Sequence, residues 1–70
     1  MDKIGIRAVE AIEETAKKNG ISAAKEYRKM DIPPSVFHSW KWRNFSPSAY
    51  YLRSMAQAGY DVRYILTGVK

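Results

Sequence analysis

Two adjacent prolines, Pro33 and Pro34, constrain this chain more than any other feature of its sequence. The residue before a proline avoids the helical region, whereas proline itself is tolerated in the first turn of a helix. One amphipathic segment therefore ends near Met30, and a second begins at Pro34 or Ser35. The sequence predicts two short helices joined by a tight turn from Asp31 to Pro34.

The chain before the prolines carries signals for two helices. Apolar residues recur at intervals of three and four from Asp2 or Lys3 to Lys18, and Gly20 predicts the end of this first helix. Ser22 can cap the second helix, because its side-chain oxygen can accept a backbone N–H of the first turn. We expect these two helices to be joined by a short turn.

The chain after the prolines carries signals for three more helices. A third helix is predicted to start at Pro34 or Ser35, and Ser46-Pro47 predicts the start of a fourth, which should end at Gly59. Asp61 can cap a last short helix. No period-two run suggests a strand, so the predicted fold class is all-α, a compact single domain of five helices over residues 1–70. Its core is predicted to include Ile12, Phe37, Trp40, Leu52, Ile65 and Leu66.

Composition leaves apolar packing as the means of stabilising so small a domain. The 70 residues contain no cysteine, which excludes disulfides and thiolate metal sites. They contain one histidine, and a single histidine cannot assemble a zinc site. We therefore expect no metal and no cofactor. No long apolar run indicates a membrane span or a signal peptide, so a cytoplasmic location is the default expectation.

The positive charge of the chain is concentrated around the prolines. The net charge is +5, yet residues 1–20 are neutral, while residues 21–45 carry five cations and two anions. A cationic excess on a pair of helices is what a phosphate-facing surface requires. The alternative is that these cations only keep a small protein soluble. The two helices and their turn have the layout of a helix-turn-helix, whose second helix lies in the major groove of DNA.

Two segments extend this interpretation to a family. Ile32 to Trp40, followed by Lys41, looks like a turn and a recognition helix with an inward tryptophan, and Leu52 to Gly68 reads LRSMAQAGYDVRYILTG. The chain thereby resembles the lambda-repressor-like, Cro/repressor class of helix-turn-helix domains found in phage repressors. The resemblance implies a five-helix domain in which the second and third helices form the helix-turn-helix.

The chain departs from that class at two positions. Members usually have a small residue in the middle of the second helix, where this chain has Tyr27, and glycine in the turn, where it has Asp31. An aspartate can adopt the left-handed conformation at modest cost, so the turn should form. Tyr27 implies either a wider crossing of the two helices or a register shifted by one residue.

The resemblance implies a sequence-specific, double-stranded-DNA-binding transcriptional regulator of a bacterial or phage-infected cell, bound as a homodimer. Its recognition helix would span about Pro34 to Arg43. The inner positions of that helix hold no arginine, glutamine or asparagine, so we expect few specific hydrogen bonds to base edges. DNA shape should then contribute to sequence specificity. The expected DNA contacts are Lys25, Arg28, Lys29, Pro34, Ser35, His38, Ser39, Lys41, Trp42, Arg43 and Asn44.

An alternative function is a protein-interaction module on the same scaffold, an antirepressor or an inhibitor of a host protein that does not bind DNA. It is favoured by aromatic residues expected at the surface, since aromatic clusters are good interface anchors; these are Trp42, Tyr50, Tyr51, Tyr60 and Tyr64. Trp42 could instead reach a phosphate, cover a seam beside Phe45 and Tyr50, or bury against a second subunit. Tyr60, Tyr64 and Val69 could pack within the last helix or form a dimer contact.

Enzymatic activity is not expected. His38 lies between two serines, but no carboxylate is placed to orient it and no oxyanion site is evident. We therefore predict no catalytic residues and treat His38 as a surface histidine of the third helix.

Overall fold

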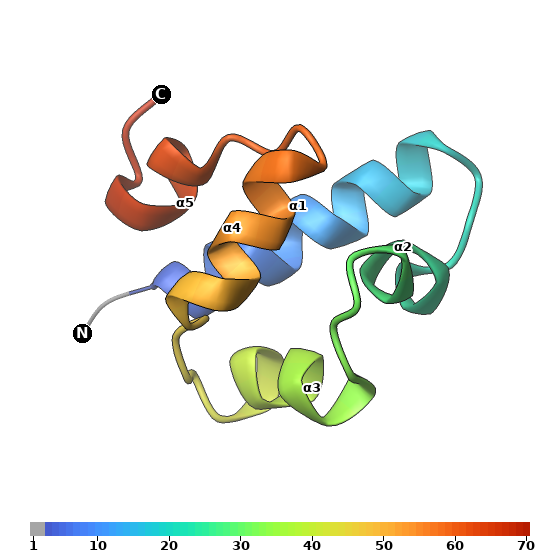
Figure 1. The fold of residues 1–70 in the computed structure, drawn as a ribbon, viewed down its shortest axis with the longest axis horizontal. Helices are drawn as coiled ribbons and strands as arrows, with labels where there is room; N and C mark the ends of the chain where they lie inside the picture. The colour runs from blue at the N-terminus through green and yellow to red at the C-terminus, as the bar shows by residue number, and fades with distance from the viewer. Residues whose placement is uncertain (1–2) are drawn as a thin grey trace.

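A computed structural model describes residues 3–70, which form five helices and no strand (Figure 1). The helices are α1 (Ile4–Lys18), α2 (Ala23–Lys29), α3 (Pro34–Trp42), α4 (Ala49–Gln57) and α5 (Val62–Thr67). The all-helical, five-helix prediction is therefore confirmed. The possible start of the first helix at Asp2 lies outside the described residues. None of the helices in residues 3–70 combines the length and the apolarity that a membrane crossing requires.

The helix α1 is the centre of the fold. It contacts α2, α3 and α5, and α4 in turn contacts α5. In Figure 1, α3 lies at the bottom of the molecule, and α5 lies at its upper left. Side chains from all five helices and from the α2–α3 turn meet in one core, whose largest fully buried side chains are Ile12, Ile32, Trp40, Met55 and Ile65.

Most of the predicted core residues are buried. Ile12, Phe37, Trp40 and Ile65 are at most 3% exposed, and Leu52 is partly buried against the same cluster. Leu66 was predicted in the core and is 43% exposed, so that prediction was wrong. Successive residues of a helix point about 100° apart, so in a helix as short as α5 the inward position of Ile65 turns its neighbour toward solvent.

The turn between α2 and α3 forms as the sequence predicts. Asp31 has a left-handed φ of 58°, and the backbone N–H of Ile32 donates to the carbonyl of Tyr27 over 3.1 Å. The ring of Tyr27 stacks on that of Phe37, with centroids 4.5 Å apart. A large residue in the middle of α2 is therefore accommodated because its ring itself forms the contact with α3.

The connection from α3 to α4 differs from the prediction. The helix α4 begins at Ala49, with Ser48 at its cap position, instead of at Ser46-Pro47. Pro47 is buried in the connection instead of starting the helix. The backbone of Phe45 lies against Gly5 of α1, where a Cβ atom would overlap the Phe45 carbonyl oxygen. This contact fixes the backbone of Phe45 within the connection, which runs outside any helix from residue 43 to residue 48.

Glu26 and Tyr60 join α2 to the link between α4 and α5. Glu26 is 6% exposed, and the Tyr60 hydroxyl donates to its Oε2 over 2.6 Å. Burial raises the pKa of Tyr60, and the hydrogen bond to Glu26 raises it further. The Tyr60 hydroxyl is therefore engaged within the chain. Tyr51 packs edge-on against Trp40, with ring centroids 5.7 Å apart. The expectation that both tyrosines are exposed interface residues was wrong, because each fills a seam between helices. For Tyr60, the alternative of packing within the chain agrees with its position.

Candidate nucleic-acid interface

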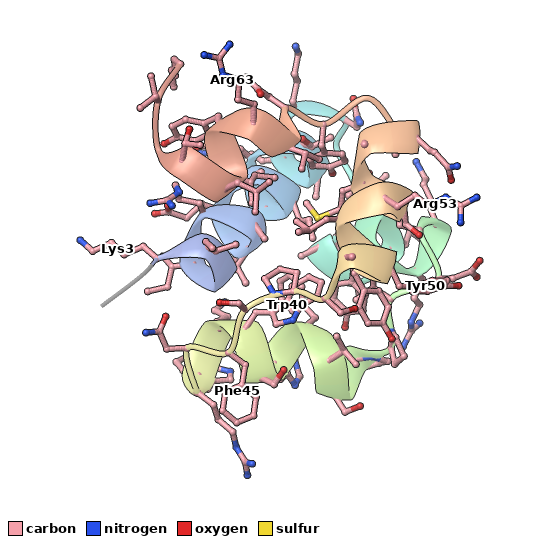
Figure 2. All side chains as sticks on the ribbon, turned by 60° about the vertical axis from the view of Figure 1, so that its left-hand side comes forward. Lys3, Trp40, Phe45, Tyr50, Arg53 and Arg63 are labelled. Atoms are coloured by element: carbon pink, nitrogen blue, oxygen red, sulfur yellow. The ribbon has the colours of Figure 1, made fainter. Side chains whose placement is uncertain are left out.

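The helix α3 has one buried face and one exposed face. It begins after Pro33, whose extended backbone places Pro34 at the first helical position. Phe37 and Trp40 fix one face in the core, and Figure 2 shows Trp40 between α3 and the other helices. The opposite side, here called the outer face, consists of Ser35, His38, Ser39 and Trp42, with Arg43 at the C-cap. Pro34 is also exposed, at the start of α3.

The residues of the outer face differ in what they can offer a ligand. His38 is exposed, with its ring centroid 6.0 Å from that of Phe37. The Ser39 hydroxyl donates to the carbonyl of Val36 over 2.6 Å, so its proton is already used. Trp42 is 73% exposed, which makes its indole the largest apolar surface on this side of α3.

A shallow hollow of about 330 Å³ lies on the outer face. It is lined by Ser35, His38, Ser39, Trp42 and Arg43, five of the residues predicted to contact DNA. None of the described residues that line it carries a carboxylate, and one carries a guanidinium. The hollow therefore combines hydroxyl, imidazole and indole groups in a neutral-to-positive setting.

Lys41 points away from this hollow toward α1. Its Nζ lies 2.6 Å from Oε2 of Glu13 and 5.3 Å from the centroid of the Trp42 ring. The ammonium is therefore shared between a carboxylate and an indole, and it is less available to a phosphate than its place in the sequence suggests. Glu13 was not among the predicted site residues, because 28 residues separate the two partners.

The other predicted contacts lie on α2 and after α3. Lys25, Arg28 and Lys29 are exposed on α2, although the Lys29 ammonium lies 3.8 Å from the buried Glu26 carboxylate. Asn44 has a left-handed φ of 57° and is partly buried. Its Oδ1 atom is enclosed without a hydrogen-bond partner among the described residues. Lys25 and Arg28 are therefore accessible to a ligand that approaches from solvent, whereas the partly buried Asn44 is less accessible.

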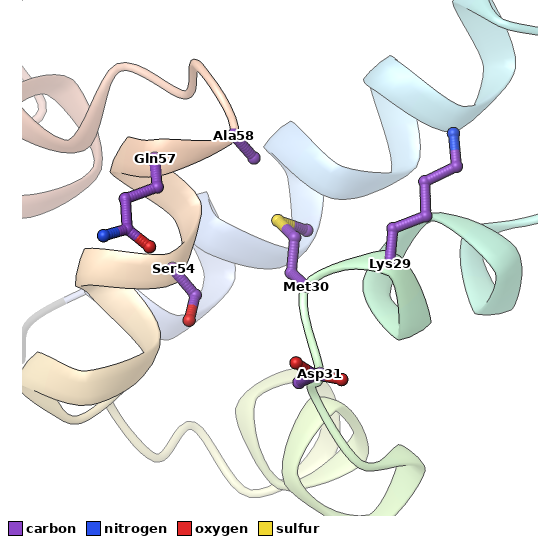
Figure 3. Close-up of a pocket in the computed structure, with 6 residues that line it drawn as sticks. All are labelled: Lys29, Met30, Asp31, Ser54, Gln57 and Ala58. Atoms are coloured by element: carbon purple, nitrogen blue, oxygen red, sulfur yellow. The ribbon is translucent and has the colours of Figure 1, made fainter.

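A second hollow lies between the α2–α3 turn and the end of α4 (Figure 3). Met30 and Asp31 border it on the turn, and Ser54 and Gln57 line it from α4. No cluster of three histidine, cysteine, aspartate or glutamate side chains suited to a metal occurs in the described part of the chain.

Two buried residues that position neighbouring elements could have been recognised in the sequence. Gly5 precedes Val9 by four residues and Ile12 by seven, so it lies on the inward stripe of α1, where a glycine marks a close approach. Glu26 lies four residues before the inward Met30, which places its carboxylate on the buried side of α2.

Comparisons with protein-family models, with curated proteins and with solved structures find no match to this chain. What the outer face of α3 can bind therefore rests on its geometry and chemistry.

Proposed function

We propose that this chain is a non-enzymatic, cytoplasmic regulator of transcription that binds double-stranded DNA with sequence preference. In this proposal α2 and α3 act as a helix-turn-helix of the lambda-repressor-like kind, and α3 enters the major groove. One observation carries the proposal: Phe37 and Trp40 hold α3 from behind, while its outer face is exposed and presents donors without carboxylates. A helix with its side chains matches the major groove, which is about 12 Å wide.

The turn and the charge distribution support the same proposal. A left-handed residue at Asp31 gives the sharp change of direction that joins two helices of such a motif. Lys25 and Arg28 on α2 and Arg43 after α3 supply exposed cations on both elements. Neutralising phosphates in this way provides most of the affinity in non-specific DNA binding.

A salt titration with matched variants tests the proposal. Fluorescence anisotropy of a labelled random-sequence duplex should report binding at low salt, and log affinity should fall linearly with log salt concentration. The substitutions Lys25→Ala and Arg28→Ala should each weaken binding to all duplexes and reduce the salt slope by about 1.

The matched control is Arg63→Ala, because Arg63 is an exposed cation on α5 and lies at the end of the molecule opposite α3 (Figure 2). It should leave the affinity unchanged. Binding that does not depend on salt, or no binding to any duplex at low salt, would contradict the proposal. We further propose a homodimer on the DNA, with the two copies of α3 about 34 Å apart, and sedimentation of the complex would give its stoichiometry.

A second candidate function is a protein-interaction module without DNA binding. It is favoured by three exposed aromatic side chains, since Trp42, Phe45 and Tyr50 are 73%, 56% and 60% exposed. It loses the support of Tyr51 and Tyr60, which pack inside the chain. The salt titration separates the two functions. For a protein-interaction module, Lys25→Ala and Arg28→Ala should not change the affinity for a duplex.

A further inference from the structure

The outer face of α3 has little capacity for bidentate base reading. Arginine reads guanine and asparagine or glutamine reads adenine through paired hydrogen bonds, and the hollow holds such a group only in Arg43, beyond the end of the helix. The Ser39 proton is used by the carbonyl of Val36. Apart from any contact by Arg43, sequence preference of this face therefore has to come from groups that do not form paired hydrogen bonds.

The apolar surface of the hollow is supplied by Trp42. In the major groove, the 5-methyl group is the only apolar substituent that distinguishes one natural base from the others. We propose that the hollow receives the 5-methyl group of a pyrimidine, against the Trp42 ring. This inference rests on the proposed function and names the feature of duplex DNA that the outer face reads.

The charges around the hollow fit this occupant. A pyrimidine edge in the major groove lies between two phosphate backbones, so the wall of a site that approaches it should be neutral or positive. The hollow meets this requirement, because its charged lining group is the guanidinium of Arg43 and its described lining includes no carboxylate. Ser35 and His38 can each hydrogen-bond beside the methyl group.

The indole of Trp42 is also held in place before any ligand arrives. The Lys41 ammonium lies 5.3 Å from the ring centroid, within the range of a cation–π contact, and Glu13 fixes that ammonium from 2.6 Å. Ordering of an exposed side chain opposes binding, and this chain of contacts from α1 reduces that cost. Lys41 thus positions the indole instead of contacting phosphate.

Methyl deletion in the DNA tests the inference directly. Duplexes are first selected from a random library with the wild-type protein, and each thymine of a selected duplex is then replaced by deoxyuridine, which removes only the methyl group. Burial of one methyl group corresponds to about a fourfold change in affinity. We expect one or two positions to lose about fourfold and the remaining positions to be unchanged. The same 5-methyl group can also come from 5-methylcytosine. A parallel library that carries 5-methylcytosine in place of cytosine tests this second source, which should appear as a gain in affinity of similar size.

Variants connect the methyl effect to the hollow. Trp42→Ala should bring the ratio of thymine to deoxyuridine affinity close to one, while Tyr50→Ala, which removes another exposed aromatic ring from α4, should leave the ratio at about four. Thermal melting followed by circular dichroism verifies that both variants fold.

Three outcomes would overturn the inference. The first is salt-dependent duplex binding that no methyl substitution changes, which leaves the proposed function intact. The second is an equal loss of affinity for both duplexes in Trp42→Ala, which would assign the indole to the DNA backbone. The third is the absence of binding to any duplex at low salt, which would remove the proposed function as well.

Discussion

Gly5→Ala should destabilise the fold although alanine favours a helix. The contact between α1 and the segment after α3 leaves no room for a side chain at Gly5, since a Cβ atom there would overlap the backbone oxygen of Phe45 and lie 3.4 Å from Cβ of Trp40. A short C···O contact is about 3.3 Å, so the backbone of Phe45 would have to retreat by roughly 1 Å. Trp40 is only 2% exposed, which prevents α3 from moving freely to relieve the overlap.

The expected magnitude is the difference between two effects. Overpacking of this kind costs about 1–3 kcal/mol, and the obstructing atom belongs to the backbone, so the upper end of the range applies. Alanine returns about 1 kcal/mol through its better helix propensity. The free energy of unfolding should therefore fall by about 2 kcal/mol, which lowers the melting temperature by roughly 8–16 °C in a domain of this size.

The assay is thermal and urea unfolding followed by circular dichroism at 222 nm. Glu10→Ala is the matched control, because Glu10 is exposed on the same helix and its replacement should change the free energy of unfolding by less than about 0.5 kcal/mol. A Gly5→Ala variant that melts at or above the wild-type temperature would refute the close approach of α1 to Phe45. The positioning of residues 43–48 would then need another explanation.

Three further predictions concern hydrogen bonds made by polar side chains. Tyr60→Phe leaves the buried Glu26 carboxylate without this donor and should cost about 1–3 kcal/mol at neutral pH. The wild-type protein should also lose stability as pH rises above about 10, because burial raises the pKa of Tyr60 in the folded state and the unfolded chain therefore releases that proton first. Urea titrations at a series of pH values measure this decline, and Tyr60→Phe should lack the part of it that comes from Tyr60. Ser22→Ala should lower the free energy of unfolding by about 1 kcal/mol, since the Ser22 side chain accepts the N–H of Lys25 over 3.1 Å. Ser48→Ala should change it little, because the Ser48 side chain accepts no capping hydrogen bond from the described residues. A similar loss of melting temperature in both variants would contradict this difference.

The elements of the fold could be predicted because their boundaries are encoded locally. Gly20 has a φ of 68° directly after α1, and the Asp61 side chain accepts the N–H of Tyr64 at the start of α5. Each of these signals acts over at most a few residues, and so does the restriction by Pro33 on the residue before it. The helix α4 was misplaced for the complementary reason. Pro47 satisfies the local rule for a first helical residue, but it is buried in the connection that precedes α4.

The surroundings of the predicted site residues could be predicted less well, because they depend on distant residues. The ion pair of Lys41 joins residues 28 positions apart, and the hydrogen bond between Glu26 and Tyr60 spans 34 positions. Periodicity identifies the face of a helix on which a residue lies, but it does not identify the helix that the face will meet. The sequence therefore indicated Ser35 and His38 on the outer face, and it did not reveal that Lys41 turns away to Glu13.

The two tryptophans of α3 differ in what they contribute to the fold, and this difference supports the proposed use of its outer face. A helix of nine residues is too short to be stable alone, so the stability of α3 comes from packing on its buried face. Trp40 is 2% exposed and contributes to that packing, whereas Trp42, two positions later and on the other side, is 73% exposed. An indole left in water contributes little to folding, because its apolar area has not been buried. The area that Trp42 leaves exposed remains available to a ligand, and the ligand must tolerate the cations beside it.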